Sequence, residues 1–312
     1  MSRTRRARVS ALAKINLDLR VLAKRPDGYH ELRTIFQTVS LADTIGLAFT
    51  PGRTTSIAVE DPLAIPDNLV ARAARLALDA MRVKGRVEIR LDKRIPMGAG
   101  LGGGSSDAAA ILLALPALAG QALDLPALWR LGQQLGSDVP FFLLGGTAVG
   151  IGRGTELFPL PDRRARPGLL VTPGIQVSTA EAYRWLGARL TSESQENKIV
   201  TFQRNTWDSG GEVSPGNDFE AVVFAQHEHL AFLKKRLKRA GATLAMMTGS
   251  GSALFGLFPT RDGVSRALRL LGEERTFRIS LVSRARYRSM WWGALGEHID
   301  GRTWPPLSRY TR

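Results

Sequence analysis

The first half of the chain switches between two hydrophobic periods. Short stretches that alternate apolar and polar residues have the period of two typical of β-strands. Residues 68–83 instead place Leu69, Ala73, Leu76 and Ala80 on one stripe, which predicts an amphipathic helix. The predicted order is strands 14–22, 34–40, 44–49 and 55–60, helix 68–83, strand 86–91, helices 107–115 and 125–135, and a hairpin of 147–150 with 155–160.

The second half continues this mixture after a polar interruption. Residues 161–168 are rich in Asp, Arg and Pro and predict a boundary between two lobes. The pattern therefore predicts an α+β chain with a first lobe (1–165), a second lobe (166–283) and a basic, tryptophan-containing tail (284–312). The second lobe is predicted to hold strands 169–172, 244–248, 253–258 and 277–282 and helices 180–186, 219–224, 228–239 and 262–271.

Glycine is concentrated between strand 86–91 and the apolar helix predicted from residue 107. Glycine accepts positive φ and lets the backbone approach a ligand closely, and the N-terminus of the next helix offers unpaired N–H groups. The loop therefore predicts an anion cradle, most naturally for phosphate. Its residues are Pro96, Met97, Gly98, Ala99, Gly100, Leu101, Gly102, Gly103, Gly104, Ser105 and Ser106.

Three other interpretations of this loop are weaker. A Walker A loop needs a lysine after its glycines, and none follows here. The dinucleotide fingerprint is matched formally by Gly98, Gly100 and Gly103, but residues 92–96 separate the loop from its strand and no acidic residue stands in the ribose position. A flexible surface turn is the third interpretation, and the direct lead into an apolar helix disfavours it.

The formal net charge is +15, from 43 basic and 28 acidic residues, which raises nucleic-acid binding as a rival interpretation. The first ten and the last thirty residues carry +4 each, so about half of the excess lies at the two ends. The absence of cysteine excludes disulfides and thiolate metal sites. Without a leader or an uncharged apolar run of roughly 18 residues, we expect a cytoplasmic protein with no membrane span.

Several segments together resemble the GHMP kinase superfamily. Residues 96–106 are similar to its phosphate loop, Gly-Ser-Asp-Val-Pro at 136–140 to the setting of its catalytic aspartate, and Met-Thr-Gly-Ser-Gly-Ser at 247–252 to its third motif. Ala-Lys-Ile-Asn-Leu at 13–17, followed by Asp-Gly-Tyr-His at 27–30, is similar to the branch whose substrate carries cytidine diphosphate. The resemblance implies a two-lobed fold, with a ribosomal protein S5 domain 2-like N-terminal lobe and an α/β-plait C-terminal lobe.

The resemblance also implies the site residues. Lys14 would reach the reacting hydroxyl and the transferred phosphoryl group, and Asp138 would accept or orient the hydroxyl proton. Asp138 before Val-Pro is equally a helix N-cap. Tyr29 would stack on a cytosine with Tyr183 opposite it, and His30 would bond the pyrimidine edge. The implied substrate-binding residues are Asn16, Tyr29, His30, Thr179, Tyr183, Gly249, Ser250 and Gly251.

The function implied is ATP-dependent phosphorylation of the tertiary 2-hydroxyl of a cytidine diphosphate-linked methylerythritol, in the non-mevalonate route to isoprenoid precursors. ATP and Mg²⁺ are the expected cofactors, with Ser105 or Ser106 contributing a hydroxyl, and a monomer or homodimer is expected. Another GHMP kinase, acting on mevalonate, homoserine or a sugar, is the alternative. A basic nucleic-acid-binding protein is the remote alternative. The tail has no counterpart in the resemblance, and docking of Trp291, Trp292 and Trp304 on the core is favoured.

Overall fold

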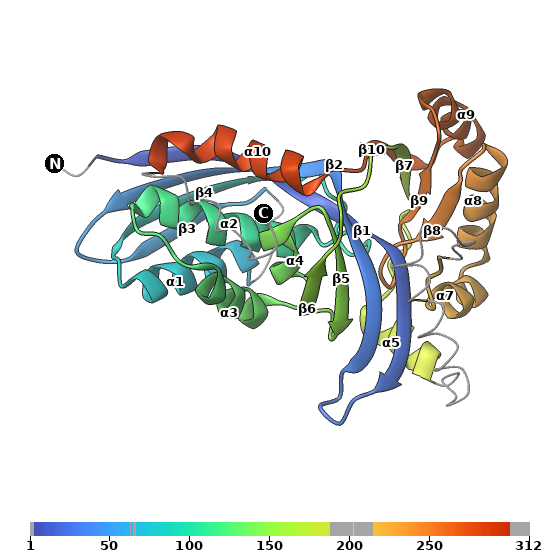
Figure 1. Cartoon of the computed structure of the whole chain (residues 1–312), viewed down its shortest axis with the longest axis horizontal. Coiled ribbons are helices and arrows are strands. Elements are labelled where there is room, and N and C mark those ends of the chain that lie inside the picture. The colour runs from blue at the N-terminus through green and yellow to red at the C-terminus, as the bar shows by residue number, and fades with distance from the viewer. Residues whose placement is uncertain (1–2, 63, 65–66, 188–201, 203–214, 300–312) are drawn as a thin grey trace.

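The computed structural model describes residues 3–62, 64, 67–187, 202 and 215–299. Figure 1 shows two lobes joined through a long two-stranded ribbon of β1 and β2. Each lobe combines a sheet with helices, as the hydrophobic pattern predicted, so the α+β fold class is confirmed.

The first lobe is built on a six-stranded sheet in the order β3–β4–β2–β5–β6, with β1 paired to β2. All neighbours are antiparallel except β3 and β4. The segments predicted as two strands, 34–40 and 44–49, are one strand, because β1 also pairs with Ala42 and Asp43 between them. The strands are β1 (Arg5–Lys24), β2 (His30–Pro51), β3 (Ser56–Glu60), β4 (Gly85–Asp92), β5 (Thr147–Gly152) and β6 (Glu156–Pro159).

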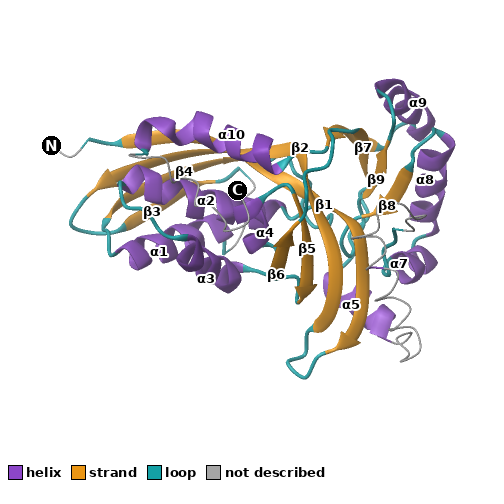
Figure 2. Ribbon diagram, in the orientation of Figure 1, coloured by secondary structure: helices purple, strands orange, loops and turns teal. Residues whose placement is uncertain are grey.

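Helices cover one side of this sheet (Figure 2). Helix α2 is buried on almost every face, which is why its sequence shows no amphipathic stripe. It begins at Gly103 and not at residue 107, because Gly102 adopts the left-handed conformation and turns the glycine loop into the first helical turn. The helices are α1 (Leu69–Met81), α2 (Gly103–Ala119), α3 (Leu125–Leu135) and α4 (Val139–Leu144).

The second lobe holds a four-stranded antiparallel sheet in the order β10–β7–β9–β8. Helices α8 and α9 pack on it through the apolar stripes that their sequences predict. The elements are β7 (Pro167–Thr172), α5 (Thr179–Gly187), α7 (Glu220–Gln226), α8 (Glu228–Arg239), β8 (Leu244–Met247), β9 (Leu254–Leu257), α9 (Arg261–Leu271) and β10 (Arg275–Ser280).

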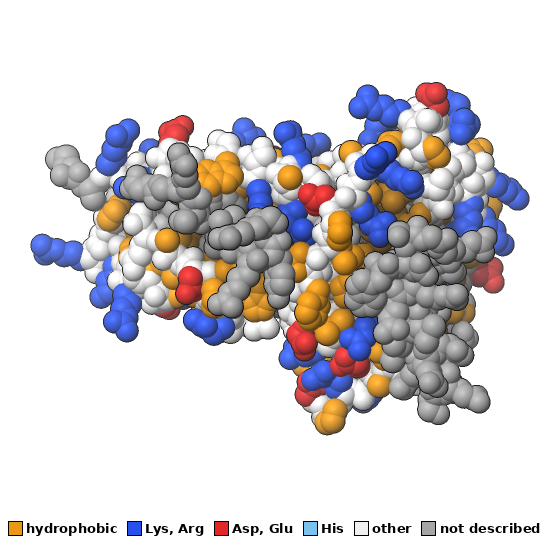
Figure 3. All heavy atoms as spheres, in the orientation of Figure 1, with side chains coloured by type: hydrophobic (Ala, Val, Ile, Leu, Met, Phe, Trp, Pro, Cys, Tyr) orange, Lys and Arg blue, Asp and Glu red, His pale blue; other side chains and the backbone are white. Residues whose placement is uncertain are grey.

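The β1–β2 ribbon ties the lobes together. Val9 and Leu12 belong to the core of the first lobe, whereas Leu19 and Val21 belong to that of the second. Beyond the lobes the ribbon continues as an arm that ends at the predicted turn, residues 25–28, where charged side chains of both signs gather (Figure 3). Residues 14–16 therefore lie at the junction between the lobes.

The predicted tail contains a helix that the sequence pattern did not reveal, α10 (Arg284–Leu295), followed by the short turn η1 (Gly296–His298). It packs back on the first lobe: Trp291 is 3% exposed, and the Tyr287 hydroxyl donates to the Phe142 carbonyl at 2.6 Å. Trp304 lies outside the described residues, and the predicted lobe boundaries stay predictions. Within the part of the chain that the structure describes, no helix combines the length and hydropathy needed to cross a membrane.

Candidate active site

The glycine loop lies between β4 and α2, with its backbone facing a cavity of about 440 Å³. Gly98, Gly100 and Gly102 all have positive φ, which L side chains rarely adopt. A Cβ on Gly100 would lie 2.3 Å from the Thr248 carbonyl oxygen, because the second lobe approaches the loop here. The loop therefore leaves its main-chain amides bare at the start of α2, as an anion cradle requires.

The two serines that end the loop have different environments. Ser106 is buried, and its hydroxyl donates to the Leu12 carbonyl at 2.7 Å, which fastens α2 to β1. Ser105 lines both the loop cavity and the larger cavity beside it. Of the two serines, Ser105 is thus the one whose hydroxyl faces a ligand space.

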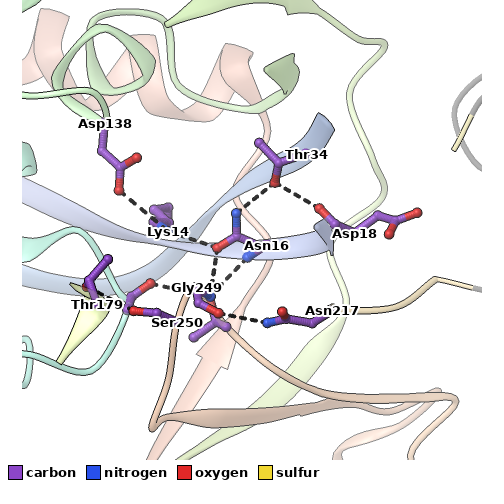
Figure 4. Close-up of polar contacts among 11 residues, drawn as sticks. Lys14, Asn16, Asp18, Thr34, Asp138, Thr179, Asn217, Gly249 and Ser250 are labelled. Carbon is purple, nitrogen blue, oxygen red and sulfur yellow. Dashed lines mark hydrogen bonds and ion pairs between the residues drawn. The ribbon is translucent and has the colours of Figure 1, made fainter. Parts of the chain in front are cut away.

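Lys14 and Asp138 come together where the lobes meet. The Lys14 ammonium is almost fully buried and lies 3.5 Å from a carboxylate oxygen of Asp138. Asp138 precedes α4 at the N-cap position, but its side chain makes no capping hydrogen bond. Asp138 therefore occupies the position of a helix cap without capping the helix through its side chain. Its carboxylate is directed to Lys14 instead (Figure 4).

Asn16 organises this junction. Its amide oxygen accepts from the Lys14 ammonium at 2.8 Å, from the Thr248 hydroxyl at 3.2 Å and from the Gly249 amide at 3.0 Å. Its amide nitrogen donates to the Thr34 hydroxyl at 2.7 Å (Figure 4). Through these bonds Asn16 holds both lobes and orients Lys14. It also lines the larger cavity, so its predicted contact with substrate stays a prediction.

The third motif forms a second glycine loop beside the first. Gly249 and Ser250 line the larger cavity, and the Ser250 hydroxyl lies 3.0 Å from that of Thr179 at the start of α5. Asn217 holds this loop by donating to the carbonyls of Met247 and Gly249, at 2.9 and 2.8 Å.

Gly251, the other residue of this loop predicted to bind substrate, packs closely against the protein. A Cβ on Gly251 would meet the Met247 sulfur at 2.8 Å, so this glycine faces protein. Its implied contact with substrate stays a prediction.

The larger cavity, about 1090 Å³, extends from Lys14 and Asp138 to the arm of the ribbon and helix α5. At the arm, the rings of His30 and Tyr183 stack with centroids 4.4 Å apart. Tyr29 is 51% exposed and carries the Arg153 guanidinium on its ring at 3.4 Å. The ring stacked on Tyr183 in this structure is that of His30. The expectation that Tyr29 stands opposite Tyr183 around a cytosine stays a prediction.

Burial sets the ionisation of two of these rings. Burial, with a smaller effect of the Lys24 charge, lowers the pKa of His30 below its ordinary value. Burial, with a smaller effect of the Asp138 carboxylate, raises the pKa of Tyr183 to about 12. Both rings are therefore neutral at pH 7, and both are suited to hydrogen bonding with an uncharged base.

A buried ion cluster beneath the glycine loop escaped the sequence analysis. The Lys93 ammonium bonds Asp43 and Asp107, the latter at 2.7 Å, and the second Asp43 oxygen accepts from the amides of Arg94 and Ile95 at 2.5 and 2.7 Å. Burial, with a smaller effect of the Asp43 charge, raises the pKa of Asp107 to about 7 against the opposing effect of Lys93. These residues lie far apart in sequence, and only the position of Lys93 just before the loop hinted at them.

Two family models match the chain. The GHMP kinases N terminal domain matches residues 68–146, and the GHMP kinases C terminal model matches residues 199–274. The first match contains the glycine loop and Asp138, and the second contains the loop at 247–252.

Full-length relatives and solved structures are more specific. A 4-diphosphocytidyl-2-C-methyl-D-erythritol kinase from Solibacter usitatus is 65% identical over 314 residues, covering 99% of both chains. Another, from Pelobacter propionicus, is 40% identical over 262 residues, with 83% of this chain and 92% of the relative covered.

The crystal structure of a 4-(cytidine 5'-diphospho)-2C-methyl-D-erythritol kinase is 37% identical, with a TM-score of 0.72 over 88% of this chain and 98% of that one. A homoserine kinase from Cytophaga hutchinsonii shares the fold, at 17% identity and a TM-score of 0.68 over 89% of this chain and 95% of the other. The chain therefore belongs to the 4-diphosphocytidyl-2-C-methyl-D-erythritol kinase family of GHMP kinases.

Proposed function

We propose that the chain transfers the γ-phosphoryl group of ATP to the tertiary 2-hydroxyl of 4-diphosphocytidyl-2-C-methyl-D-erythritol. The products are the 2-phosphate and ADP, and the reaction belongs to non-mevalonate isoprenoid precursor biosynthesis. The observation that carries the proposal is the Lys14–Asp138 pair, which lies where the glycine-loop cavity meets the larger one. The two cavities share Gly100, Gly102 and Ser105.

The step divides among a few groups. The substrate hydroxyl oxygen forms a bond to the γ-phosphorus, the bond to the β-phosphate bridging oxygen breaks, and ADP leaves. Asp138 accepts or orients the hydroxyl proton, and Lys14 stabilises the charge on the phosphoryl oxygens as it transfers. Asn16 holds the Lys14 ammonium within reach of Asp138 and of the transferred phosphoryl group. The amides of the glycine loop hold the phosphates that do not react.

The donor set suits a magnesium ion that arrives with ATP. Among the described residues, no group of three or more His, Cys, Asp or Glu side chains is arranged to hold a metal. Mg²⁺ keeps several waters and binds phosphate oxygens with one or two protein ligands, so the Ser105 hydroxyl and the Asp138 carboxylate are sufficient candidates. When bound, the ion neutralises phosphate charge during transfer.

At the far end of the larger cavity, Tyr29, His30 and Tyr183 bind the cytidine. Stacking of a base on an aromatic ring contributes about 1–3 kcal/mol and tolerates any base. The uncharged His30 ring therefore selects cytosine by hydrogen bonds to its edge. A cytoplasmic location and assembly as a monomer or homodimer stay predictions.

The test is substrate preference. ADP release by the purified protein would be measured with the diphosphocytidyl substrate and, at the same ATP and Mg²⁺ concentrations, with mevalonate, homoserine and galactose. We expect kcat/KM for the cytidyl substrate to be higher by at least about 10³-fold, since buried polar groups left unpaired penalise the wrong alcohol. Phosphorus NMR of the product should show one new phosphomonoester and an intact diphosphate. A higher kcat/KM for any alcohol without cytidine would contradict the proposal.

A further inference from the structure

We propose that Arg153 is the residue that recognises the diphosphate of the nucleotide substrate, held ready for it on the ring of Tyr29. This inference rests on the function proposed above and adds a binding residue to it. Arg153 lies in the turn between β5 and β6 and lines the larger cavity together with Lys14 and Asp138.

The geometry of Arg153 prepares it for an anion. Its guanidinium carbon lies 3.4 Å from the centroid of the Tyr29 ring, the distance of a stacked cation–π pair. A guanidinium stacked on a ring keeps the N–H groups at its edge available as the fork that matches two phosphate oxygens. The Nε of Arg153 is buried and has no hydrogen-bond partner among the described residues. A buried donor without a partner is costly, so a ligand oxygen would relieve it.

The other charges around the cavity are largely engaged. Lys14 is bound by Asp138 and Asn16, and Arg184 lies 3.5 Å from Glu181. Asp27 is close enough to Arg153 for the Arg153 charge to lower its pKa. The Asp27 carboxylate, however, already accepts hydrogen bonds from the Tyr29 amide at 3.1 Å and from Arg25 at 3.2 Å.

Lys24 and Arg153 remain as cations of the cavity that form no ion pair with a described residue. A diphosphate that links two groups carries about two negative charges, which these two cations match.

The position of Arg153 favours the diphosphate over either end of the substrate. The transferred phosphoryl group is served by Lys14 and the glycine loop, and the base by His30 and Tyr183. The diphosphate joins the cytidine to the alcohol, so it must pass between these two sets of residues. Arg153 contacts Tyr29 at the nucleoside end and lines the same cavity, which puts its fork within the stretch that the diphosphate occupies.

The experiment compares two competitive inhibitors that differ only in the diphosphate. Inhibition constants for cytidine 5′-diphosphate and for cytidine would be measured against the cytidyl substrate at saturating ATP. In Arg153→Gln, we expect the preference for the diphosphate over cytidine to fall by about 10- to 100-fold, the value of a charge-assisted pair. Arg153→Lys restores the charge without the fork and should recover part of the preference. Arg184→Gln is the matched control, because it removes one charge from the same cavity, and it should keep the wild-type preference.

The outcomes separate this inference from the function on which it rests. An unchanged preference in a folded Arg153→Gln, judged by wild-type thermal unfolding, would overturn the inference alone. Equal weakening of cytidine and of its diphosphate would also overturn it, since Arg153 would then bind the base. If neither compound inhibits the wild-type protein, the proposed function fails together with the inference.

Discussion

The two ends of the site are built in different ways. The phosphate end is backbone: glycines with positive φ, packed so closely that a Cβ on Gly100 would collide with the Thr248 carbonyl of the other lobe. The nucleoside end is side chain: the rings of Tyr29, His30 and Tyr183 and the guanidinium of Arg153, partly exposed around a wide cavity. Backbone amides bind any triphosphate, whereas ring faces and edges distinguish one substrate from another. We infer that the chain binds ATP by its main chain and selects its alcohol by side chains.

The largest effect is expected between the two ends, at Asp138. Asp138→Asn keeps the shape but removes the charge that lies 3.5 Å from Lys14. General-base assistance contributes about 10²–10⁴-fold, so kcat should fall by at least 10²-fold. The dissociation constant of a non-hydrolysable ATP analogue, measured by calorimetry, should change little. A kcat within a few fold of wild type would show that Asp138 does not handle the proton.

The next effect tests the backbone end. Gly100→Ala adds a methyl 2.3 Å from a backbone oxygen that has no rotamer to move to, so the two glycine loops must separate. The KM for ATP should rise by at least about 10-fold and the protein should lose roughly 1–3 kcal/mol of unfolding free energy. Gly98→Ala is the matched control, because Gly98 also has positive φ but a Cβ there meets nothing within 4 Å. Similar losses in both variants would mean that conformational strain alone matters.

Gly102 belongs to the backbone end, but it also packs against Lys14. A Cβ at this position would meet the Phe142 ring at 2.9 Å and the stem of Lys14 at 3.2 Å. Gly102→Val would therefore displace Lys14, and it would lower kcat as well as ATP affinity.

A smaller effect is expected at the side-chain end. Tyr29→Ala removes a stacking surface and the support of Arg153, so the KM for the cytidyl substrate should rise by about 10- to 100-fold. The KM for ATP should stay near that of wild type, and Tyr29→Phe, which keeps the ring, should stay near wild type for both substrates. A rise in the KM for ATP that matches the rise for the alcohol would break the separation of the two ends.

The sequence was informative about the backbone end and less so about the side-chain end. Glycines at fixed spacing before an apolar helix predict a cradle because their φ requirements are local, and Gly98, Gly100 and Gly102 do adopt positive φ. Local patterns also predicted α3 and α8 to the residue. The stack of His30 on Tyr183 joins segments more than a hundred positions apart, and Arg153 reaches Tyr29 only because β5 pairs with β2. Such contacts depend on how strands that are distant in the sequence pair with each other. The hydrophobic pattern within one segment carries no information about that pairing.

The helix α10 was missed for another reason. Its tryptophans and arginines are mixed around the helix without a stripe, since it packs Tyr287 and Trp291 on the first lobe. Arg284 also turns inward and donates to the carbonyls of Leu160 and Thr147. Its resemblance to an unstructured basic tail came from composition, which does not report where a helix docks. The buried cluster of Lys93 with Asp43 and Asp107 was missed because burial cannot be inferred from an isolated charge.

The smallest effect on turnover is expected at that cluster, and its signature is a pH dependence. The pKa of Asp107 is about 7 in the folded protein, whereas a carboxyl of an unfolded chain titrates near about 4. Because the folded value is raised, the stability that Asp107 contributes is complete below about pH 4 and is lost as the pH rises through about 7.

Asp107→Asn, which imitates the protonated form, should remove this loss, so the variant should gain stability relative to wild type between pH 5 and 8 in urea unfolding. Lys93 and Asp107 line the glycine-loop cavity from beneath, but Asn keeps the shape of Asp107, so kcat at neutral pH should change only a few fold. If wild type and variant instead keep a constant difference in unfolding free energy across this range, Asp107 is ionised throughout, and the loop is held by a full ion pair with Lys93 and not by a shared proton.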